Sequence, residues 1–166
     1  MDNFANKTIA LVGNAQSLLK NNYGPLINTY DIVCRYNRGV NIINQSAQGT
    51  RTDVAFYSPP SNYADIETNA LVVHVTPKHR DIEYNKQFVH IPEHYTQMGM
   101  DRPSTGAISI NWLLSCNTAS ITLFGFDFKD TPTYYDTNRS HEPHDYNAEK
   151  TYVLDLVDRG LLKYIA

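Results

Sequence analysis

The chain has 166 residues and a formal net charge of −3, a length that is typical of one domain. We therefore expect residues 1–166 to form a single compact unit. The absence of a basic run or basic helix argues against a nucleic-acid-binding surface. No apolar run approaches the ~20 residues that a membrane-spanning helix needs, and no signal peptide is recognised.

Apolar runs alternate with polar segments along the chain, which is the pattern of an α/β fold. The predicted strands are residues 8–12, 31–36, 53–57, 70–75, 88–91, 120–124 and 161–165. The predicted helices are residues 15–21, a short one around Ile66, 105–116, and 147–159 with Gly160 at its end. Most of the strands are nearly continuous apolar runs, which is typical of strands buried on both faces of a parallel sheet. The sequence therefore predicts one Rossmann-like α/β domain with a mainly parallel sheet flanked by helices.

A glycine turn follows the first predicted strand. Gly13 and Asn14 open it, and Ser17 lies one helical turn further on. The position suits a nucleotide, but the segment lacks the glycine spacing of a dinucleotide fingerprint and the lysine of a triphosphate loop. Asn14 and Ser17 instead offer side-chain hydrogen bonds. The alternative is a simple helix start, with Gly13 turning the chain and Asn14 capping the helix.

Two further turns point to a ligand. Asn37 follows the second predicted strand, where its amide can read a base or a sugar hydroxyl, or only shape the strand exit. Ser104, Thr105 and Gly106 open an apolar helix, and a helix N-terminus favours an anion. Two anion-binding turns and a histidine near the chain end, His144, indicate a phosphate-bearing substrate and a proton transfer.

The polar segment before the last helix carries two histidines, His141 and His144, with Glu142 between them. A metal site is one interpretation, but Pro143 breaks the helical spacing that such a pair needs, so no metal is expected. We favour one histidine as a general base, because its ordinary pKa lets it accept a proton near neutral pH. The alternative is that His144 only begins the last helix.

Three blocks of this sequence resemble, in order and type, the sialyl motifs of glycosyltransferase family 29, the eukaryotic-type sialyltransferases. The large motif is matched by residues 9–14, 23–25 and 31–38, the small motif by 102–106 and 123–126, and the very small motif by His144 and Glu149. Residues 13–18 and 125–128 are also similar to the bacterial sialyltransferases of family 42. Thr133 stands where the third motif of the family begins with histidine.

The resemblance implies a single nucleotide-binding domain that moves sialic acid, or a related nonulosonic acid, from a CMP-activated donor to a hydroxyl of an acceptor glycan. It also implies inversion, no metal and no further cofactor. Carried over to this chain, the nucleotide would be held by Gly13, Asn14, Ser17 and Asn37. The carboxylate or cytidine end would be held by Ser104, Thr105 and Gly106, and the departing phosphate by Tyr134 or Tyr135. His144 would deprotonate the acceptor hydroxyl.

The two cysteines of the chain bear on its cellular location. Cys34 and Cys116 lie in apolar stretches without metal-ligand spacing, which favours buried, reduced thiols and a cytoplasmic protein. Animal members of the resembled family pair a cysteine before the glycine turn with one in the small-motif helix. Ile9 stands at the first of these positions here, so the resemblance implies that this disulfide is absent and that the protein is of microbial or viral origin. One alternative donor is a Kdo-type CMP-sugar, and one alternative activity is CMP-sugar binding or hydrolysis without transfer. A third alternative is a metal-dependent hydrolase built on His141, Glu142 and His144.

Overall fold

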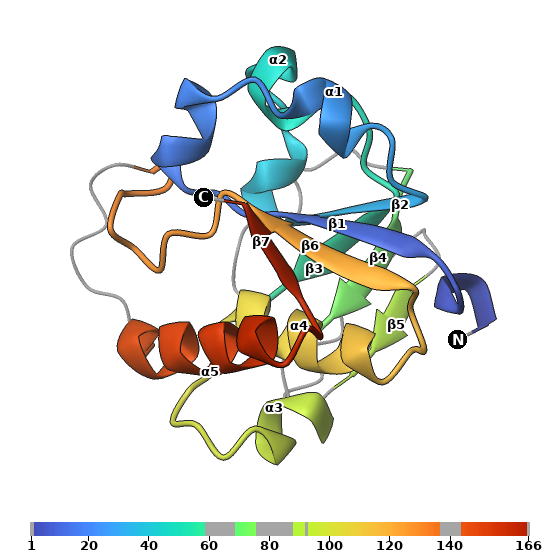
Figure 1. Cartoon of the computed structure of the whole chain (residues 1–166), viewed down its shortest axis with the longest axis vertical. Coiled ribbons are helices and arrows are strands. Elements are labelled where there is room, and N and C mark those ends of the chain that lie inside the picture. The colour runs from blue at the N-terminus through green and yellow to red at the C-terminus, as the bar shows by residue number, and fades with distance from the viewer. Residues whose placement is uncertain (1, 59–68, 76–87, 92, 137–143, 166) are drawn as a thin grey trace.

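The computed structural model of the chain describes residues 2–58, 69–75, 88–91, 93–136 and 144–165 (Figure 1). The helix predicted around Ile66 lies outside these residues, as do His141 and Glu142. No helix in the described ranges combines the length and the apolar character needed to cross a membrane.

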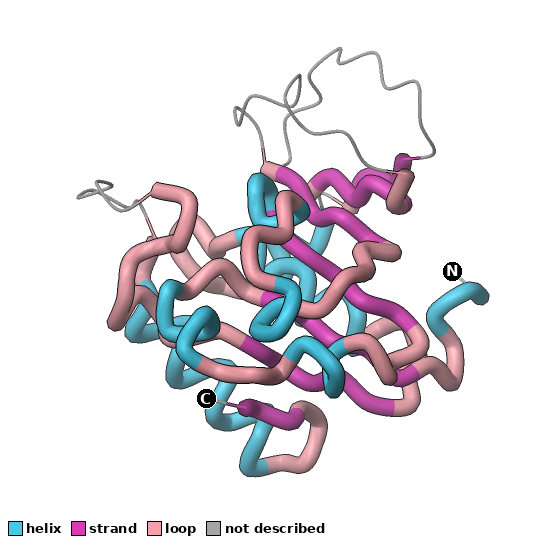
Figure 2. Tube along the Cα trace, turned by 90° about the horizontal axis from the view of Figure 1, so that it is seen from above, coloured by secondary structure: helices cyan, strands magenta, loops and turns pink. Residues whose placement is uncertain are grey.

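The described strands form one seven-stranded sheet in the order β5-β4-β3-β2-β1-β6-β7, and every pairing is parallel. The strands are β1 (Thr8–Val12), β2 (Ile32–Tyr36), β3 (Val54–Tyr57), β4 (Leu71–His74), β5 (Phe88–His90), β6 (Ser120–Phe124) and β7 (Lys163–Ile165). Figure 2 shows them side by side in a single sheet. The predicted α/β class and parallel sheet are thus confirmed.

Helices cover both faces of the sheet (Figure 1). One face carries α3 (Glu93–Gln97), α4 (Thr105–Leu114) and α5 (Tyr146–Asp158). The other carries the 3-10 helices η2 (Gln16–Lys20) and η3 (Asn37–Val40) and the short helices α1 (Gly24–Ile27) and α2 (Gln45–Gln48). A further 3-10 helix, η1 (Asp2–Phe4), lies near the N-terminus.

The helix predicted at residues 15–21 is therefore a shorter 3-10 helix, and α1, α2 and α3 were not predicted. Helices of four or five residues have too few apolar positions to show a helical period. The predicted end of α4 at Cys116 was also too late, because Ser115 is its C-cap.

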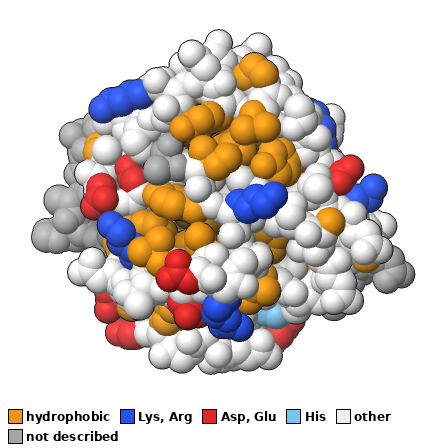
Figure 3. All heavy atoms as spheres, in the orientation of Figure 1, with side chains coloured by type: hydrophobic (Ala, Val, Ile, Leu, Met, Phe, Trp, Pro, Cys, Tyr) orange, Lys and Arg blue, Asp and Glu red, His pale blue; other side chains and the backbone are white. Residues whose placement is uncertain are grey.

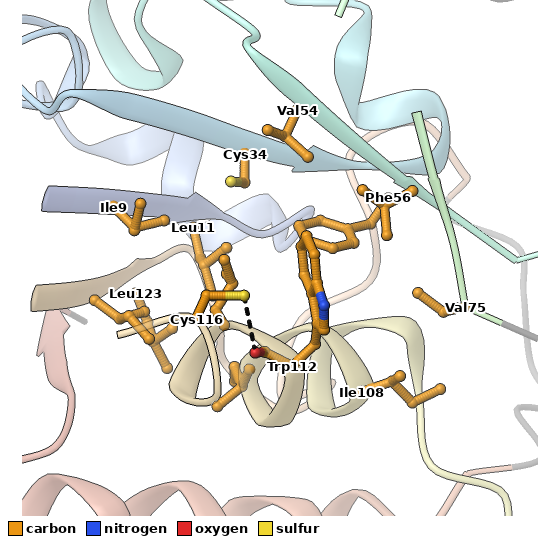
Figure 4. Close-up of a cluster of buried hydrophobic side chains, with 14 of the residues drawn as sticks. Ile9, Leu11, Cys34, Val54, Phe56, Val75, Ile108, Trp112, Cys116 and Leu123 are labelled. Carbon is orange, nitrogen blue, oxygen red and sulfur yellow. Dashed lines mark hydrogen bonds between the residues drawn. The ribbon is translucent and has the colours of Figure 1, made fainter. Parts of the chain in front are cut away.

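The larger hydrophobic core lies between the sheet and α4 (Figure 4). Trp112 of α4 is 2% exposed and packs edge-on against Phe4 and Phe56, with ring centroids 5.1 and 5.7 Å apart. Cys34 and Cys116 are both buried, free thiols, and burial raises the pKa of each. Because α4 is anchored here along its length, its N-terminus is held at a defined place beside the sheet.

Charged side chains on the face shown in Figure 3 are scattered and of mixed sign, with no continuous basic patch. This distribution agrees with the small net charge of −3. Nothing on this face resembles the electrostatic footprint of a nucleic-acid-binding protein.

The strand order places a natural ligand position at the ends of three strands. The chain proceeds from β1 outward through β2 to β5 and then returns to β6 on the other side of β1. The register aligns Val12, the last residue of β1, with Phe124 at the end of β6. Ligands of open parallel sheets bind where the strand order reverses, beyond the carboxyl ends of the strands.

Candidate functional site

A cleft of about 600 Å³ opens at the carboxyl ends of β1, β2 and β6. Most of the site residues predicted from the sequence line it: Gly13, Asn14, Asn37, Ser104, Thr105, Gly106, Tyr135 and His144. Ser17 and Tyr134 are not among its lining residues. The parallel sheet brings these separate segments together because the ends of neighbouring strands share one edge.

Gly13 allows β1 to continue closely against the end of β6. Its backbone N–H donates to the carbonyl of Phe124 at 2.7 Å. A Cβ atom at this position would lie 2.3 Å from the carbonyl oxygen of Gly125, a backbone atom that cannot move aside freely. Only glycine fits this close approach, so the turn is shaped by packing as well as by any ligand.

The Asn14 amide ties the first turn to two other segments of the cleft. Its Nδ2 donates to the backbone oxygen of Tyr36 at 3.1 Å and to the hydroxyl of Tyr135, also at 3.1 Å. A backbone carbonyl can only accept, so this contact sets which end of the amide is nitrogen. The helix-capping alternative for Asn14 is wrong, because the N-cap of η2 is Ala15, and the first-turn N–H of Ser17 donates to the Thr131 hydroxyl at 3.2 Å.

Ser17 and Tyr134 act behind the wall of the cleft. The Ser17 hydroxyl donates to the Asp127 carboxylate at 2.9 Å, and Asp127 itself lines the cleft. The Tyr134 hydroxyl donates to the Gly39 carbonyl at 3.2 Å and approaches Asn14 Oδ1 at 3.4 Å. Burial raises the pKa of Tyr134. Of the two neighbouring tyrosines considered from the sequence, Tyr135 is the one that lines the cleft.

Arg35 carries a buried positive charge on β2, next to the end of that strand. The side chain is fully buried on β2, and its Nη2 donates to the Gln48 carbonyl at 2.6 Å. Its Nε donates to the Arg51 carbonyl and the Thr52 hydroxyl, both at 3.0 Å. Burial lowers the pKa of Arg35 to about 10, so the group stays charged at neutral pH. Electrostatic interaction with Tyr134 opposes this lowering of the Arg35 pKa.

The Asn37 side chain is bonded at one end, and the residue lines the cleft. Its φ of +48° is left-handed, a conformation that asparagine tolerates better than most residues. Its Oδ1 accepts from the backbone N–H of Ser58 at 3.2 Å, which joins the end of β2 to the residue after β3. Within the described residues its Nδ2 makes no hydrogen bond, and the residue lines the cleft. The turn and ligand interpretations of Asn37 are therefore compatible.

The N-terminus of α4 is capped from two directions. The Ser104 hydroxyl accepts from the N–H of Ala107 at 3.3 Å. Ser104 also donates its N–H and its hydroxyl to the two carboxylate oxygens of Glu149, at 2.6 and 2.7 Å. In a capping box the third helical residue supplies such a carboxylate, but here that residue is Ala107 and α5 supplies it instead. The cap thus joins α4 to α5.

This arrangement changes which groups of α4 can meet an anion. The Glu149 carboxylate takes the donors of Ser104, so the N–H groups of Thr105 and Gly106 are the ones that the described contacts leave to a ligand. Glu149 is 5% exposed, and burial raises its pKa, while the hydrogen bonds from Ser104 oppose that shift. The sequence placed Glu149 in a motif but did not reveal this contact.

His144 is held in one tautomer. Its Nδ1 lies 2.6 Å from the backbone oxygen of Arg102. Since a carbonyl only accepts, Nδ1 carries the hydrogen and Nε2 of the neutral ring is left as a proton acceptor. The ring also packs edge-on against Tyr146, with centroids 5.8 Å apart. Asp145 caps α5 through the N–H of Ala148, so the His144 side chain is not needed to begin that helix.

The structure adds two cleft residues that lie in the motif-like segments but were not named as site residues from the sequence. Tyr36 and Phe126 lie within or beside apolar strands, where an aromatic residue is ordinary. Among the described residues, no three His, Cys, Asp or Glu side chains are grouped to hold a metal ion. Of the three residues considered for a metal-dependent hydrolase, His141 and Glu142 lie outside the described residues, so the metal-site hypothesis stays untested.

Comparisons with known proteins agree on one family. The model of glycosyltransferase family 29 (sialyltransferase) matches residues 2–98, more than half of the chain. One similar relative is CMP-N-acetylneuraminate-beta-galactosamide-alpha-2,3-sialyltransferase 1 of Gallus gallus, with 25% identity over an alignment of 201 residues. The alignment covers 97% of this chain and 58% of the relative. The chain therefore spans little more than half the length of this curated relative.

Solved structures show the same fold. A crystal structure of a mammalian sialyltransferase has a TM-score of 0.76 at 19% identity, covering 96% of this chain and 69% of that one. The sialyltransferase CstII from Campylobacter jejuni, in complex with cytidine-5'-monophosphate, has a TM-score of 0.64 at 17% identity, covering 96% and 79%. At these identities the likeness establishes a shared architecture.

Proposed function

Because this chain belongs to glycosyltransferase family 29, the sialyltransferases, we propose that it is a CMP-sugar-dependent glycosyltransferase. It moves sialic acid, or a related nonulosonic acid, from the CMP-activated donor to a hydroxyl of an acceptor glycan. The observation that carries the proposal is one cleft in which Asn14, Asn37, the first turn of α4 and His144 all meet. The names of the relatives, which include a CMP-N-acetylneuraminate enzyme and a complex with CMP, support the same donor.

The donor is oriented by two groups of contacts. The nucleotide lies against Asn14 and Asn37, at the ends of β1 and β2, and the carboxylate of the sugar meets the N–H groups of Thr105 and Gly106. Cleavage releases CMP with one phosphate group, whose charge fixed hydrogen-bond donors can stabilise without a divalent cation. We therefore propose that transfer is metal-independent.

Tyr135 is the proposed phosphate contact in place of the family histidine. Thr133 stands at the position of that histidine, and its hydroxyl donates to the backbone oxygen of Asp136 at 3.0 Å. Tyr135 lines the cleft, and its hydroxyl accepts from Asn14 at 3.1 Å, which holds it beside the first glycine turn. A tyrosine hydroxyl both donates and accepts, so in this position it can contact a phosphate oxygen of the departing CMP.

His144 is the proposed general base. Its Nε2 accepts the proton of the acceptor hydroxyl while that oxygen forms a bond to the anomeric carbon. The bond from this carbon to the phosphate oxygen breaks on the opposite side, which inverts the configuration. The Arg102 carbonyl, 2.6 Å from Nδ1, stabilises the imidazolium that results.

The first experiment measures ligand binding to the wild-type protein. CMP at 100 times its Kd should raise the free energy of unfolding by about 2.7 kcal/mol, whereas ADP and NAD should not. Equal stabilisation by ADP or NAD would contradict the assignment.

The second experiment measures transfer from CMP-sialic acid to a panel of glycans. His144→Ala should lower the rate by about 10²–10⁴-fold while CMP binds nearly normally, because a general base contributes about that factor. His94→Ala is the control, since that histidine lies on α3 and contacts Asn111. Activity should survive EDTA. Release of CMP without a transfer product would instead identify a hydrolase, and near-normal transfer by His144→Ala would exclude this base.

A further inference from the structure

Tyr36, the last residue of β2, contacts three of the segments that build the cleft. Its backbone oxygen accepts from Asn14 Nδ2 at 3.1 Å, next to the first glycine turn. Its hydroxyl lies 2.8 Å from Ser109 Oγ on α4. Its ring packs edge-on against Phe126, with centroids 5.7 Å apart and planes at 85°. The ring also stacks on Phe56, which holds it in the core without help from the hydroxyl.

The hydroxyl of Tyr36 begins a buried chain of two hydrogen bonds. The Ser109 hydroxyl donates to the backbone oxygen of Gly106 at 2.8 Å. Because that proton is used, Ser109 Oγ accepts the proton of Tyr36. Tyr36 is 4% exposed and Ser109 is 0% exposed, so water does not compete for either bond. Burial also raises the pKa of Tyr36, which keeps its hydroxyl protonated.

This chain of bonds ends in the first turn of α4. Gly106 lines the cleft, and a Cβ atom there would lie only 3.1 Å from the Phe126 ring. The turn is therefore held on one side by the Phe126 ring and tied through Ser109 to Tyr36. Since Tyr36 also holds Asn14, one residue sets the spacing between the nucleotide turn and the helix N-terminus.

We propose that Tyr36, acting through Ser109, is a positioning residue that selects for a ligand spanning both ends of the cleft. This inference rests on the proposed function, in which CMP occupies the Asn14 end and the sugar carboxylate occupies the Gly106 end. A CMP-linked acid sugar engages both ends at once, so its affinity depends on their spacing. CMP alone engages only the first end, so its affinity does not.

The test compares two ligands on matched variants. Tyr36→Phe and Ser109→Ala each remove a single oxygen from the chain of bonds. Calorimetry measures the Kd of CMP and of CMP-3FNeuAc, a substrate analogue. In each variant we expect the Kd of the analogue to rise about 3- to 10-fold, the effect of one lost hydrogen bond, while the Kd of CMP changes less than about 2-fold.

The double variant and two controls make the test specific. Tyr36→Phe combined with Ser109→Ala should weaken analogue binding no more than either single change, because both break the same chain. Ser115→Ala removes a hydroxyl that donates to the Trp112 carbonyl at the far end of α4, at 2.6 Å. Tyr30→Phe removes a hydroxyl from a ring that packs on Phe124, outside the cleft. Both controls should bind the two ligands as the wild type does.

The outcomes separate the inference from the proposed function. Suppose that the wild type binds CMP and the analogue. If the variants then raise the Kd of both ligands equally, or of neither, Tyr36 is structural and the inference is wrong. Additive losses in the double variant would also contradict it. A wild-type protein that binds neither ligand overturns the proposed function and the inference together. If Tyr36→Phe fails to fold, Ser109→Ala gives the same comparison.

Discussion

Replacing Gly39 with alanine tests whether the Asn14 amide contacts the nucleotide. Gly39 is buried in η3 and its φ is not left-handed, so alanine is limited only by space. A Cβ atom would lie 1.9 Å from Asn14 Oδ1 and 3.0 Å from the Tyr134 hydroxyl. Ordinary contacts begin near 3.4 Å, so the amide must move by about 1.5 Å, the difference between 3.4 and 1.9.

That movement breaks two hydrogen bonds. In the wild type, Asn14 Nδ2 donates to the Tyr36 carbonyl and to the Tyr135 hydroxyl, each at 3.1 Å, and the variant loses both bonds. At about 0.5–1.5 kcal/mol for each bond, we expect Gly39→Ala to lower the free energy of unfolding by about 1–3 kcal/mol. If Asn14 reads the nucleotide, the Kd of CMP should also rise at least about 10-fold. Urea unfolding measures the first quantity and calorimetry the second.

Gly160→Ala is the matched control. Gly160 has a φ of +71°, and no atom lies within 4 Å of the position that a Cβ would take, so alanine there meets backbone strain but no clash. The strain should cost about 1–2 kcal/mol of stability and leave the Kd of CMP unchanged. A contact between Asn14 and the nucleotide is excluded if Gly39→Ala binds CMP as tightly as the wild type, or if Gly160→Ala weakens CMP binding as much as Gly39→Ala does.

Two further predictions concern the remaining polar groups of the cleft. Asn37→Asp keeps an oxygen for Ser58 and a side chain that tolerates a φ of +48°, so the melting temperature should change little. The Kd of CMP should rise at least about 5-fold because the amide donors are lost, and an unchanged Kd would exclude the contact. Glu149→Gln removes a carboxyl whose pKa burial raises, so the folded state of the wild type holds this proton more tightly than the unfolded state. The wild type should therefore lose stability relative to Glu149→Gln as pH rises from about 4 to 8, and a difference in urea unfolding that is independent of pH would contradict this.

The sequence by itself determined the fold class. Strands buried on both faces must be apolar at nearly every position, so β1 and β6 could be located with their observed bounds. The turns holding Asn14 and Asn37 could be assigned to one edge, because parallel strands share the edge at which they end. The short helices α1 and α2 could not, since four residues show no helical period.

Only the tertiary structure decided how the cleft is held together. Glu149 caps α4 from α5 across 45 residues of sequence, and Tyr36 reaches Ser109 across 73. Ser17 and Tyr134 fit the same local pattern as Asn14 and Tyr135, yet they pack behind the wall. The spacing of residues along a helix or strand predicts the face of that element on which a side chain lies. The partner of a buried polar group depends on which elements pack together, and that is settled only when the chain folds.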